Sequence, residues 1–170
     1  MNTWPRWVLG ALMATLLGCT QHGAPPPPAS PQASTVCDLD GMTLADFPGP
    51  KAQIFYAHTA QPLFLCNTVE LVALYRHPEQ VRQVRALYVQ DMAATSWDAP
   101  VGHWIDARQA WYVQGSRKLG SMGPTLASFS SAAAASAFAR REGGRVYDFA
   151  SIPESSTILD GGVLKDRMEK

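Results

Sequence analysis

Hydrophobic and polar positions in the first half of the chain follow the order strand, strand, helix, strand. Residues 52–56 and 62–65 are short apolar runs on either side of a polar turn, which predicts a hairpin. A helix is expected after Asn67, because Asn67 followed by Glu70 is typical of a capping box, and a proline ends it. Residues 86–91 are rich in strand formers and predict a third strand.

The second half repeats this order with a glycine-rich loop in one of the strand positions. Residues 103–105 and 110–114 predict strands, and the loop follows at residues 115–123. A helix is expected over about residues 130–141, and two glycines after it favour a left-handed cap. Residues 145–149 predict the closing strand.

These two units indicate an α+β domain of two similar small lobes, each made of strands with one helix. The domain is expected over residues 36–152, which is enough chain for one compact unit. Its lobes would cover about residues 36–95 and 96–152. The remaining residues, 153–170, end in a charged stretch and are expected to form a flexible C-terminal tail.

The N-terminus predicts export and lipidation. Residues 1–18 contain one basic residue, Arg6, then an apolar run, and then Leu-Leu-Gly directly before Cys19. That order is typical of a lipoprotein signal peptide whose cysteine becomes acylated. The apolar run is shorter than the roughly 20 residues that a transmembrane helix needs. An ordinary secretory signal with an incidental Cys19 is the alternative.

Residues 19–35 predict a lipidated proline-rich tether. Four consecutive prolines stand among Ala, Ser and Gln, and such segments favour extended polyproline geometry at about 3.1 Å per residue. The chain is therefore expected at the periplasmic face of a bacterial membrane. Thr20, where an acidic residue would favour retention, indicates the outer membrane.

Charge and motifs exclude several classes of function. Fourteen basic residues balance fourteen acidic ones, and no basic stripe is present, so nucleic-acid binding is not expected. The chain has no phosphate-binding glycine loop, no nucleophile elbow and no His-Glu-x-x-His helix. We therefore expect a binding protein and not an enzyme.

Sulfur atoms outside the predicted helices are the best candidates for chemistry. Cys37 precedes a Gly-Met pair that contains Met42, and Met122 stands between glycines, where a methionine has little packing to do. Thiolate and thioether groups are soft donors that select Cu(I). For Met42 and Met92 a packing role is the alternative.

Other roles for the cysteines and histidines stay open. Cys37 could pair with Cys66, since exported chains carry disulfides. Cys66 lies between a strand and a helix start and could equally be a packed thiol. His58 and His103 lie in or beside loops, where they could be auxiliary ligands or simply accept a hydrogen bond.

Six segments, in order along the chain, resemble the NosL family, the copper-binding lipoproteins that accompany bacterial nitrous oxide reductase. The resemblance extends from Cys37 to about residue 152 and includes the lipobox. The segments are Cys37-x-x-x-Gly41-Met42, residues 48–54, residues 88–92, residues 104–107, residues 112–116 and Met122-Gly123.

The resemblance implies a periplasmic Cu(I) chaperone with a fold similar to alkylmercury lyase. It would supply the copper-sulfide centre of nitrous oxide reductase, and its partners would be that enzyme and its membrane ABC-type maturation complex. Cys37 and Met122 match positions expected to bind copper, with Met42 a weaker candidate. Many relatives have Cys-x-x-Cys-Gly-Met, whereas Asp40 replaces the second cysteine here. That favours a mixed thiolate and thioether site, with Asp40 either tuning its charge or not participating. A scaffold lipoprotein of the same machinery, without copper transfer, is the alternative function.

Overall fold

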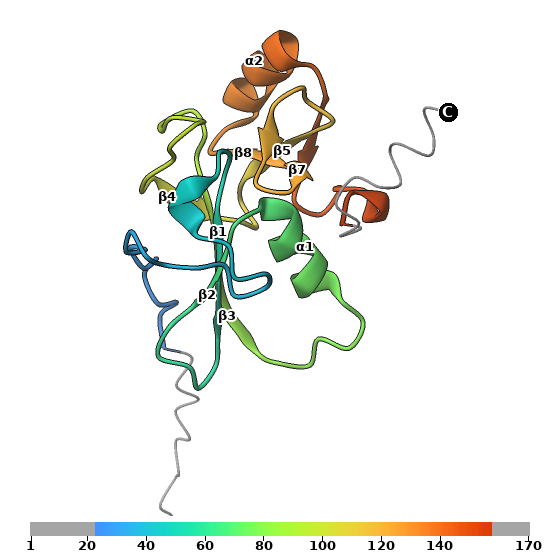
Figure 1. Ribbon diagram of the computed structural model, residues 1–170. Helices are drawn as coiled ribbons and strands as arrows, with labels where there is room; N and C mark the ends of the chain where they lie inside the picture. Colours follow the sequence, from blue (N-terminus) through green and yellow to red (C-terminus); the bar gives the residue numbers. More distant parts are fainter. Residues whose placement is uncertain (1–22, 158–170) are drawn as a thin grey trace, which may run out of the picture.

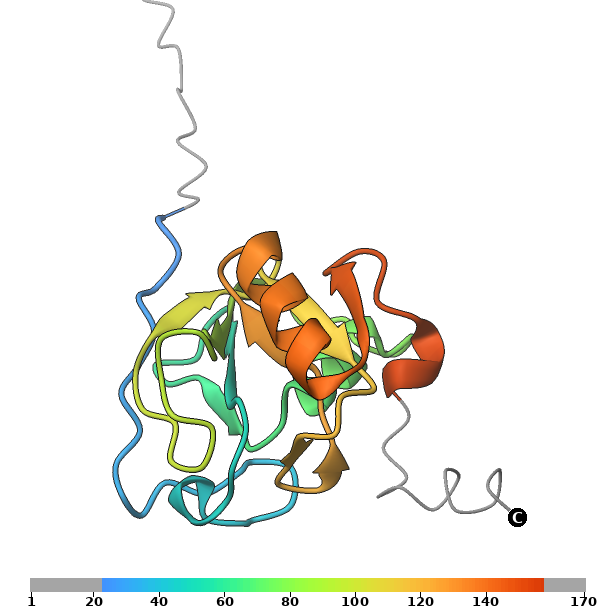
Figure 2. The same cartoon turned by 90° about the horizontal axis from the view of Figure 1, so that it is seen from above.

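The computed structural model describes residues 23–157, so the predicted signal peptide, Cys19 and the chain after residue 157 lie outside the description. Figures 1 and 2 show the described chain in two orientations. The described residues form two α-helices, nine strands and two short 3-10 helices, η1 (Leu44–Asp46) and η2 (Glu154–Thr157). No helix among these residues is long and apolar enough to cross a membrane.

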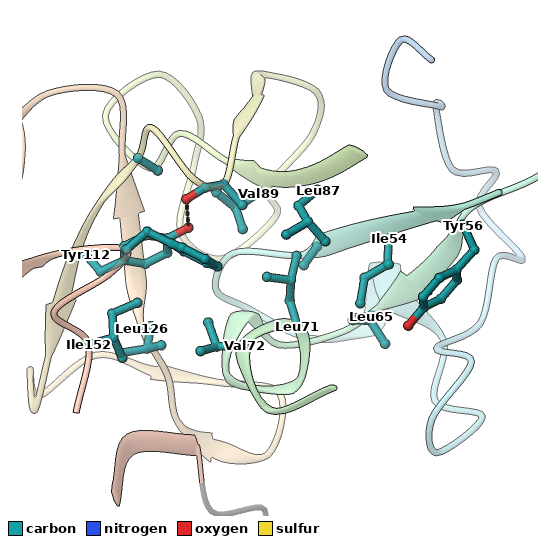
Figure 3. Packing of buried hydrophobic residues seen from close by; sticks show 14 residues of the cluster. Ile54, Tyr56, Leu65, Leu71, Val72, Leu87, Val89, Tyr112, Leu126 and Ile152 are labelled. Carbon is teal, nitrogen blue, oxygen red and sulfur yellow. Dashed lines mark hydrogen bonds between the residues drawn. The ribbon is translucent and has the colours of Figure 1, made fainter. Parts of the chain in front are cut away.

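The first sheet has four antiparallel strands in the order β2-β1-β3-β4. Helix α1 (Thr68–Arg76) lies beside this sheet (Figure 1). Its Leu71 and Val72 are buried in one cluster with Ile54 and Leu87 from the two central strands (Figure 3). The strands are β1 (Ala52–Tyr56), β2 (Leu63–Leu65), β3 (Val84–Gln90) and β4 (Trp104–Asp106).

The second sheet has three antiparallel strands in the order β8-β5-β9, and α2 (Ala132–Glu142) packs on it. Phe138 of α2 packs against Phe129 of β8, with ring centroids 5.0 Å apart. A separate two-stranded hairpin, β6–β7, lies between β5 and β8 in the sequence. The strands are β5 (Trp111–Gln114), β6 (Leu119–Gly120), β7 (Gly123–Pro124), β8 (Ala127–Phe129) and β9 (Arg145–Asp148).

One hydrophobic core joins the two halves. Tyr112 of β5 and Leu126 are fully buried in the same cluster as Leu71 and Val72 (Figure 3). The Tyr112 hydroxyl donates a hydrogen bond of 2.6 Å to the Ala107 carbonyl. Because apolar surface from both halves is buried in this cluster, the halves stabilise each other.

The α+β class and both helices are as predicted, but three elements differ from the sequence prediction. The sequence assigns residues 103–105 to the second half, whereas β4 belongs to the first sheet. It pairs with β3, with Trp104 opposite Gln90. The predicted glycine-rich loop contains the β6–β7 hairpin. The strand β8 was not predicted, because its three residues are too few to show a period.

Both ends of the described chain are packed against the domain. Residues 23–35, which the composition predicts to be a spacer, are hydrogen-bonded to side chains of β1 and β3. At the other end η2 lies against α1. The Arg76 guanidinium of α1 donates a hydrogen bond of 2.7 Å to the Ile152 carbonyl. Contacts with the domain are therefore made by residues 23–35 and by η2.

Candidate metal centre

Cys66 and Glu70 are brought together by the way α1 begins. Cys66 lies between the end of β2 and Asn67, whose side chain accepts the Val69 N–H at 3.0 Å as the N-cap. The Glu70 carboxylate turns back and accepts the Asn67 N–H at 3.2 Å, which completes a capping box. The same turn places the Glu70 oxygens beside the Cys66 sulfur.

Cys37 reaches this position from a tight loop before the first strand. A bridge between Val36 and Thr43 closes the loop, and the Cys37 N–H donates to the Met42 carbonyl at 2.8 Å. Gly41, with a φ of +78°, makes the turn that this closure needs. The Asp38 N–H donates to the Phe64 carbonyl of β2 at 2.8 Å, so the loop is fixed next to Cys66.

The result is a compact cluster of two thiols and two carboxylates. One ligand atom from each of Cys37, Asp40, Cys66 and Glu70 lies within 4.8 Å of all the others. The Cys37 and Cys66 sulfurs are 3.5 Å and 3.4 Å from the two different oxygens of Glu70. Asp40 lies 3.6 Å from the Cys66 sulfur. All four residues except Asp40 are buried.

The β6–β7 hairpin lies against the cluster. The Ser121 hydroxyl is 3.0 Å from both the Cys66 carbonyl oxygen and the Cys66 sulfur. Met122 follows at the turn of this hairpin, and 45% of its surface is exposed. Gly120 permits the close approach, because a Cβ at this position would lie 3.0 Å from the Thr125 Cβ.

The two thiols have opposite pKa shifts. A hydrogen bond from the Cys66 thiol lowers the pKa of Cys37, because it stabilises the Cys37 thiolate. The same bond, followed by burial, raises the pKa of Cys66. Cys37 is therefore the thiol that ionises first.

The charged neighbours of the thiols are also shifted. Burial raises the pKa of Glu70, so this carboxylate holds a proton more readily than an exposed one. Burial lowers the pKa of Lys51 to about 8, and negative charge on Cys66, Glu70 and Cys37 acts in the opposite direction. The Lys51 ammonium donates to the carbonyls of Phe47 and Pro48, at 2.8 Å and 3.0 Å. The Lys51 ammonium is therefore a positive charge that interacts favourably with the acidic groups of the cluster.

Comparison with known proteins identifies the family of this chain. The sequence profile of the NosL family matches residues 28–157. The chain belongs to the NosL family. The copper-binding lipoprotein NosL of Achromobacter cycloclastes is 39% identical over 166 residues, which cover 93% of this chain and 85% of that protein. The copper-binding lipoprotein NosL of Stutzerimonas stutzeri is 36% identical over 177 residues, which cover 96% and 92%.

A solved structure of the family shares the fold. The crystal structure of the copper chaperone NosL from Shewanella denitrificans matches with a TM-score of 0.72 at 38% identity. The match covers 77% of this chain and 99% of that one. The α+β architecture described above is therefore the architecture of a NosL protein.

The residues predicted for copper binding in this NosL chain lie in different surroundings. Cys37 is part of the cluster. Met122 is on the adjoining hairpin, one residue after the Ser121 hydroxyl that touches Cys66. Met42 is half-buried, and its N–H donates to the Asp40 carboxylate at 2.9 Å. All three remain predicted ligands, with Met122 and Met42 at the edge of the cluster.

The other candidates lie away from the four-residue cluster. Met92 is buried in the second hydrophobic cluster, beside Phe129 and Phe138. His58 lies in a turn and His103 directly precedes β4; both have positive φ, 63° and 52°, and neither belongs to the four-residue cluster.

Cys66 and Glu70 were not among the predicted ligands. The sequence favours Cys66 as a disulfide partner or a packed thiol, and both cysteines of the described chain are free. The useful signal was the four-residue spacing, since a glutamate at the third helical position of a capping box turns back towards the residues before the helix.

Proposed function

We propose that this chain is a membrane-anchored periplasmic metallochaperone that binds Cu(I) as cargo and supplies it for assembly of the copper-sulfide centre of nitrous oxide reductase. The buried pair of thiols beside two carboxylates is the observation that carries the proposal. Copper binding and chaperone activity are named for the relatives. The route to nitrous oxide reductase rests on the family resemblance.

The donor set suits a soft monovalent ion. Cys37 and Cys66 offer two thiolates, and Cu(I) accepts two or three sulfur ligands and exchanges them readily. A thiol must lose its proton before it binds a metal. The two sulfurs are 3.5 Å and 3.4 Å from oxygens of Glu70, so this carboxylate is placed to accept a released proton. Lys51 offsets part of the remaining negative charge.

The half-exposed methionine is suited to the transfer step. Met122 lies at the turn of the hairpin beside Cys66, and a thioether binds Cu(I) without any change of protonation. The thiols are almost completely buried, with 1% and 0% exposure, so Met122 is the sulfur donor more accessible to a partner. Ligand exchange would then pass through Met122, with Met42 as a second thioether at the edge.

The proposed location is argued from the N-terminal sequence, and the proposed partners from the family resemblance. Acylation of Cys19 would anchor the chain at the periplasmic face, and Thr20 favours the outer membrane. Separation of inner and outer membranes tests that location. The partners would be nitrous oxide reductase and its membrane ABC-type maturation complex.

Competition titration with Cu(I) tests the proposal. The reduced chain, with the signal peptide removed and Cys19→Ala to keep it in solution, is titrated without oxygen against a Cu(I) chelator. We expect one tightly bound equivalent and an affinity loss of about 100-fold, or roughly 3 kcal/mol, for Cys37→Ser or Cys66→Ser. Met122→Leu should weaken binding less, by about 10-fold. Met92→Leu, which changes a core methionine, is the matched control and should bind normally.

Two outcomes would contradict the proposal. Unchanged binding in both cysteine variants would mean that the cluster is not the copper site. Tight binding without transfer to copper-free nitrous oxide reductase would leave the scaffold function as the better description.

A further inference from the structure

Strand β1 is buried on both faces, although α1 covers only one of them. Ala52, Ile54 and Tyr56 belong to the core cluster beneath α1. The alternate residues, Gln53 and Phe55, are 0% and 5% exposed. Since alternate side chains of a strand point to opposite faces, a second layer must cover the face of Gln53.

That layer is the N-terminal strap, residues 23–35. The Gln53 side-chain amide donates to the Ala29 carbonyl at 2.7 Å and accepts the Ala29 N–H at 2.9 Å. The Tyr88 hydroxyl donates to the Pro26 carbonyl at 2.7 Å. Gln53 and Tyr88 are opposite each other in the β1–β3 pair, so the strap lies on one face of the sheet.

A third residue holds the beginning of the strap. Arg85 donates to the carbonyls of Gly23 and Ala24, at 3.0 Å and 2.8 Å. The register shift between β1 and β3 makes Arg85 the extra residue, because Phe55 faces Ala86 and Tyr56 faces Val84. A β-bulge redirects side chains locally. A polyproline segment has no internal hydrogen bonds, so its carbonyls are free for such contacts.

The start of the strap and the metal centre are at opposite ends of the first sheet. Gly23 is held by Arg85, near the start of β3. Cys66 follows Leu65, which is paired with Ala52, and Ala52 is paired with Val89 near the end of β3. The strap thus begins at the end of the sheet remote from the thiols, as its course in Figure 1 shows.

We propose that the docked strap seats this remote end of the domain on the phospholipid surface that carries the anchor, and so turns the metal centre away from the bilayer. The inference rests on the lipid anchor of the proposed function but not on copper binding. Once the strap is docked, only residues 20–22 lie between Cys19 and Gly23, a distance of four residue steps along the chain. Four residues span at most about 14 Å, whereas residues 19–35 as a free polyproline segment would span about 50 Å.

The surface at this end suits an interface with anionic headgroups. Val81 is 91% exposed, and Arg82 and Arg85 are both exposed beside it in the chain. Glu79 is the acidic residue in the same segment. Basic side chains are attracted to anionic phospholipid, and an exposed apolar side chain gains by contact with the interface.

Spin labels on the lipidated full chain test the inference. The mature protein is reconstituted in vesicles of phosphatidylcholine with phosphatidylglycerol, and a nitroxide is attached at Val81→Cys or, as the matched control, at Val101→Cys. Val101 is also exposed, at 73%, and precedes β4 on the side of Trp104, which pairs with Gln90 at the metal-centre end. We expect a headgroup-bound relaxing agent to broaden the Val81 label strongly and the Val101 label little.

Two variants then separate the strap from the anchor. Gln53→Met with Tyr88→Phe removes three of the five hydrogen bonds that hold the strap and leaves the two from Arg85, and the Ala29 amide should then exchange as an unprotected amide. Insertion of about twelve Gly and Ser residues between His22 and Gly23 lengthens the leash without touching the fold. In both variants, the broadening of the Val81 label should fall to that of the Val101 label while the protein still floats with the vesicles.

Equal broadening of both labels in the unaltered chain would overturn the inference and leave the copper proposal intact. Failure of the unaltered protein to float with vesicles would instead show that the chain is not lipid-anchored, and this would also overturn the inference.

Discussion

The Thr125 hydroxyl donates a hydrogen bond of 2.7 Å to the Asn67 side-chain oxygen, across 58 residues of sequence. Asn67 is also the N-cap of α1, and the neighbouring Thr68 hydroxyl donates to the Leu126 carbonyl at 2.6 Å. These buried bonds join the helix that carries Glu70 to the segment that follows the β6–β7 hairpin. The hairpin with Met122 is therefore positioned by the same residues that begin α1.

Thr125→Val should loosen this connection with almost no change in side-chain volume. It removes the donor to Asn67 and the contact with the Thr68 hydroxyl. We expect the free energy of unfolding to fall by about 1–2 kcal/mol, because buried polar groups lose partners. Cu(I) affinity should fall towards that of Met122→Leu. Urea unfolding and chelator competition measure the two effects, and Thr59→Val, in a local turn, is the control.

Glu70→Gln should separate the two roles of this residue. The amide oxygen still accepts the Asn67 N–H, so the capping box and the thermal stability should be nearly retained. The charge beside both thiols is lost, so Cu(I) affinity should fall. Glu70→Ala should lose the affinity and also about 1 kcal/mol of stability. Chelator competition and thermal unfolding measure both quantities. An affinity that is unchanged in Glu70→Gln would mean that the carboxylate takes no part in binding.

Oxidation of the copper-free protein should join Cys37 and Cys66. Their sulfurs lie within 4.8 Å of each other, and both are free. The two thiols would give two electrons and two protons to an added disulfide such as oxidised glutathione. The product should lack two hydrogens by mass spectrometry and should no longer bind Cu(I). Protein loaded with copper beforehand should be protected. Equal oxidation with and without copper would place the ion elsewhere.

The stability of the copper-free protein should depend on pH through Lys51. Burial lowers the pKa of Lys51 from 10.5 to about 8 in the folded chain. Between these values the unfolded chain binds more protons, so the contribution of Lys51 to the free energy of unfolding rises with pH. From about pH 8 to about pH 10, the free energy of unfolding of the wild type should therefore rise relative to that of Lys51→Met. Urea unfolding at several pH values measures the difference, and parallel curves for the two proteins would contradict this assignment.

The sequence predicts local structure well where the signal is local. The Asn67 and Glu70 pair defines the start of α1, and Gly143, with a φ of +80°, ends α2 as expected. Short elements such as β8 show no hydrophobic periodicity in the sequence. Their position in a sheet depends on partner strands elsewhere in the chain.

The candidate site was predicted in part for the same reason. Cys37 was identified from its sequence surroundings, but Glu70 joins it across 33 residues. Such a contact is fixed by the fold and leaves no local pattern. The strap shows the same limit, since its proline content describes its backbone and not the Gln53 and Tyr88 side chains that bind it.

Three segments distant in sequence build the metal centre: residues 37–40, residues 66–70 and the hairpin at residues 119–124. Closing the loops between them costs chain entropy, so an unfolded chain offers only separate thiols. Copper loading should therefore follow folding. For a chain exported in the unfolded state, as its first residues predict, this order of events would keep newly made protein from carrying copper out of the cytoplasm and would require it to collect its cargo outside.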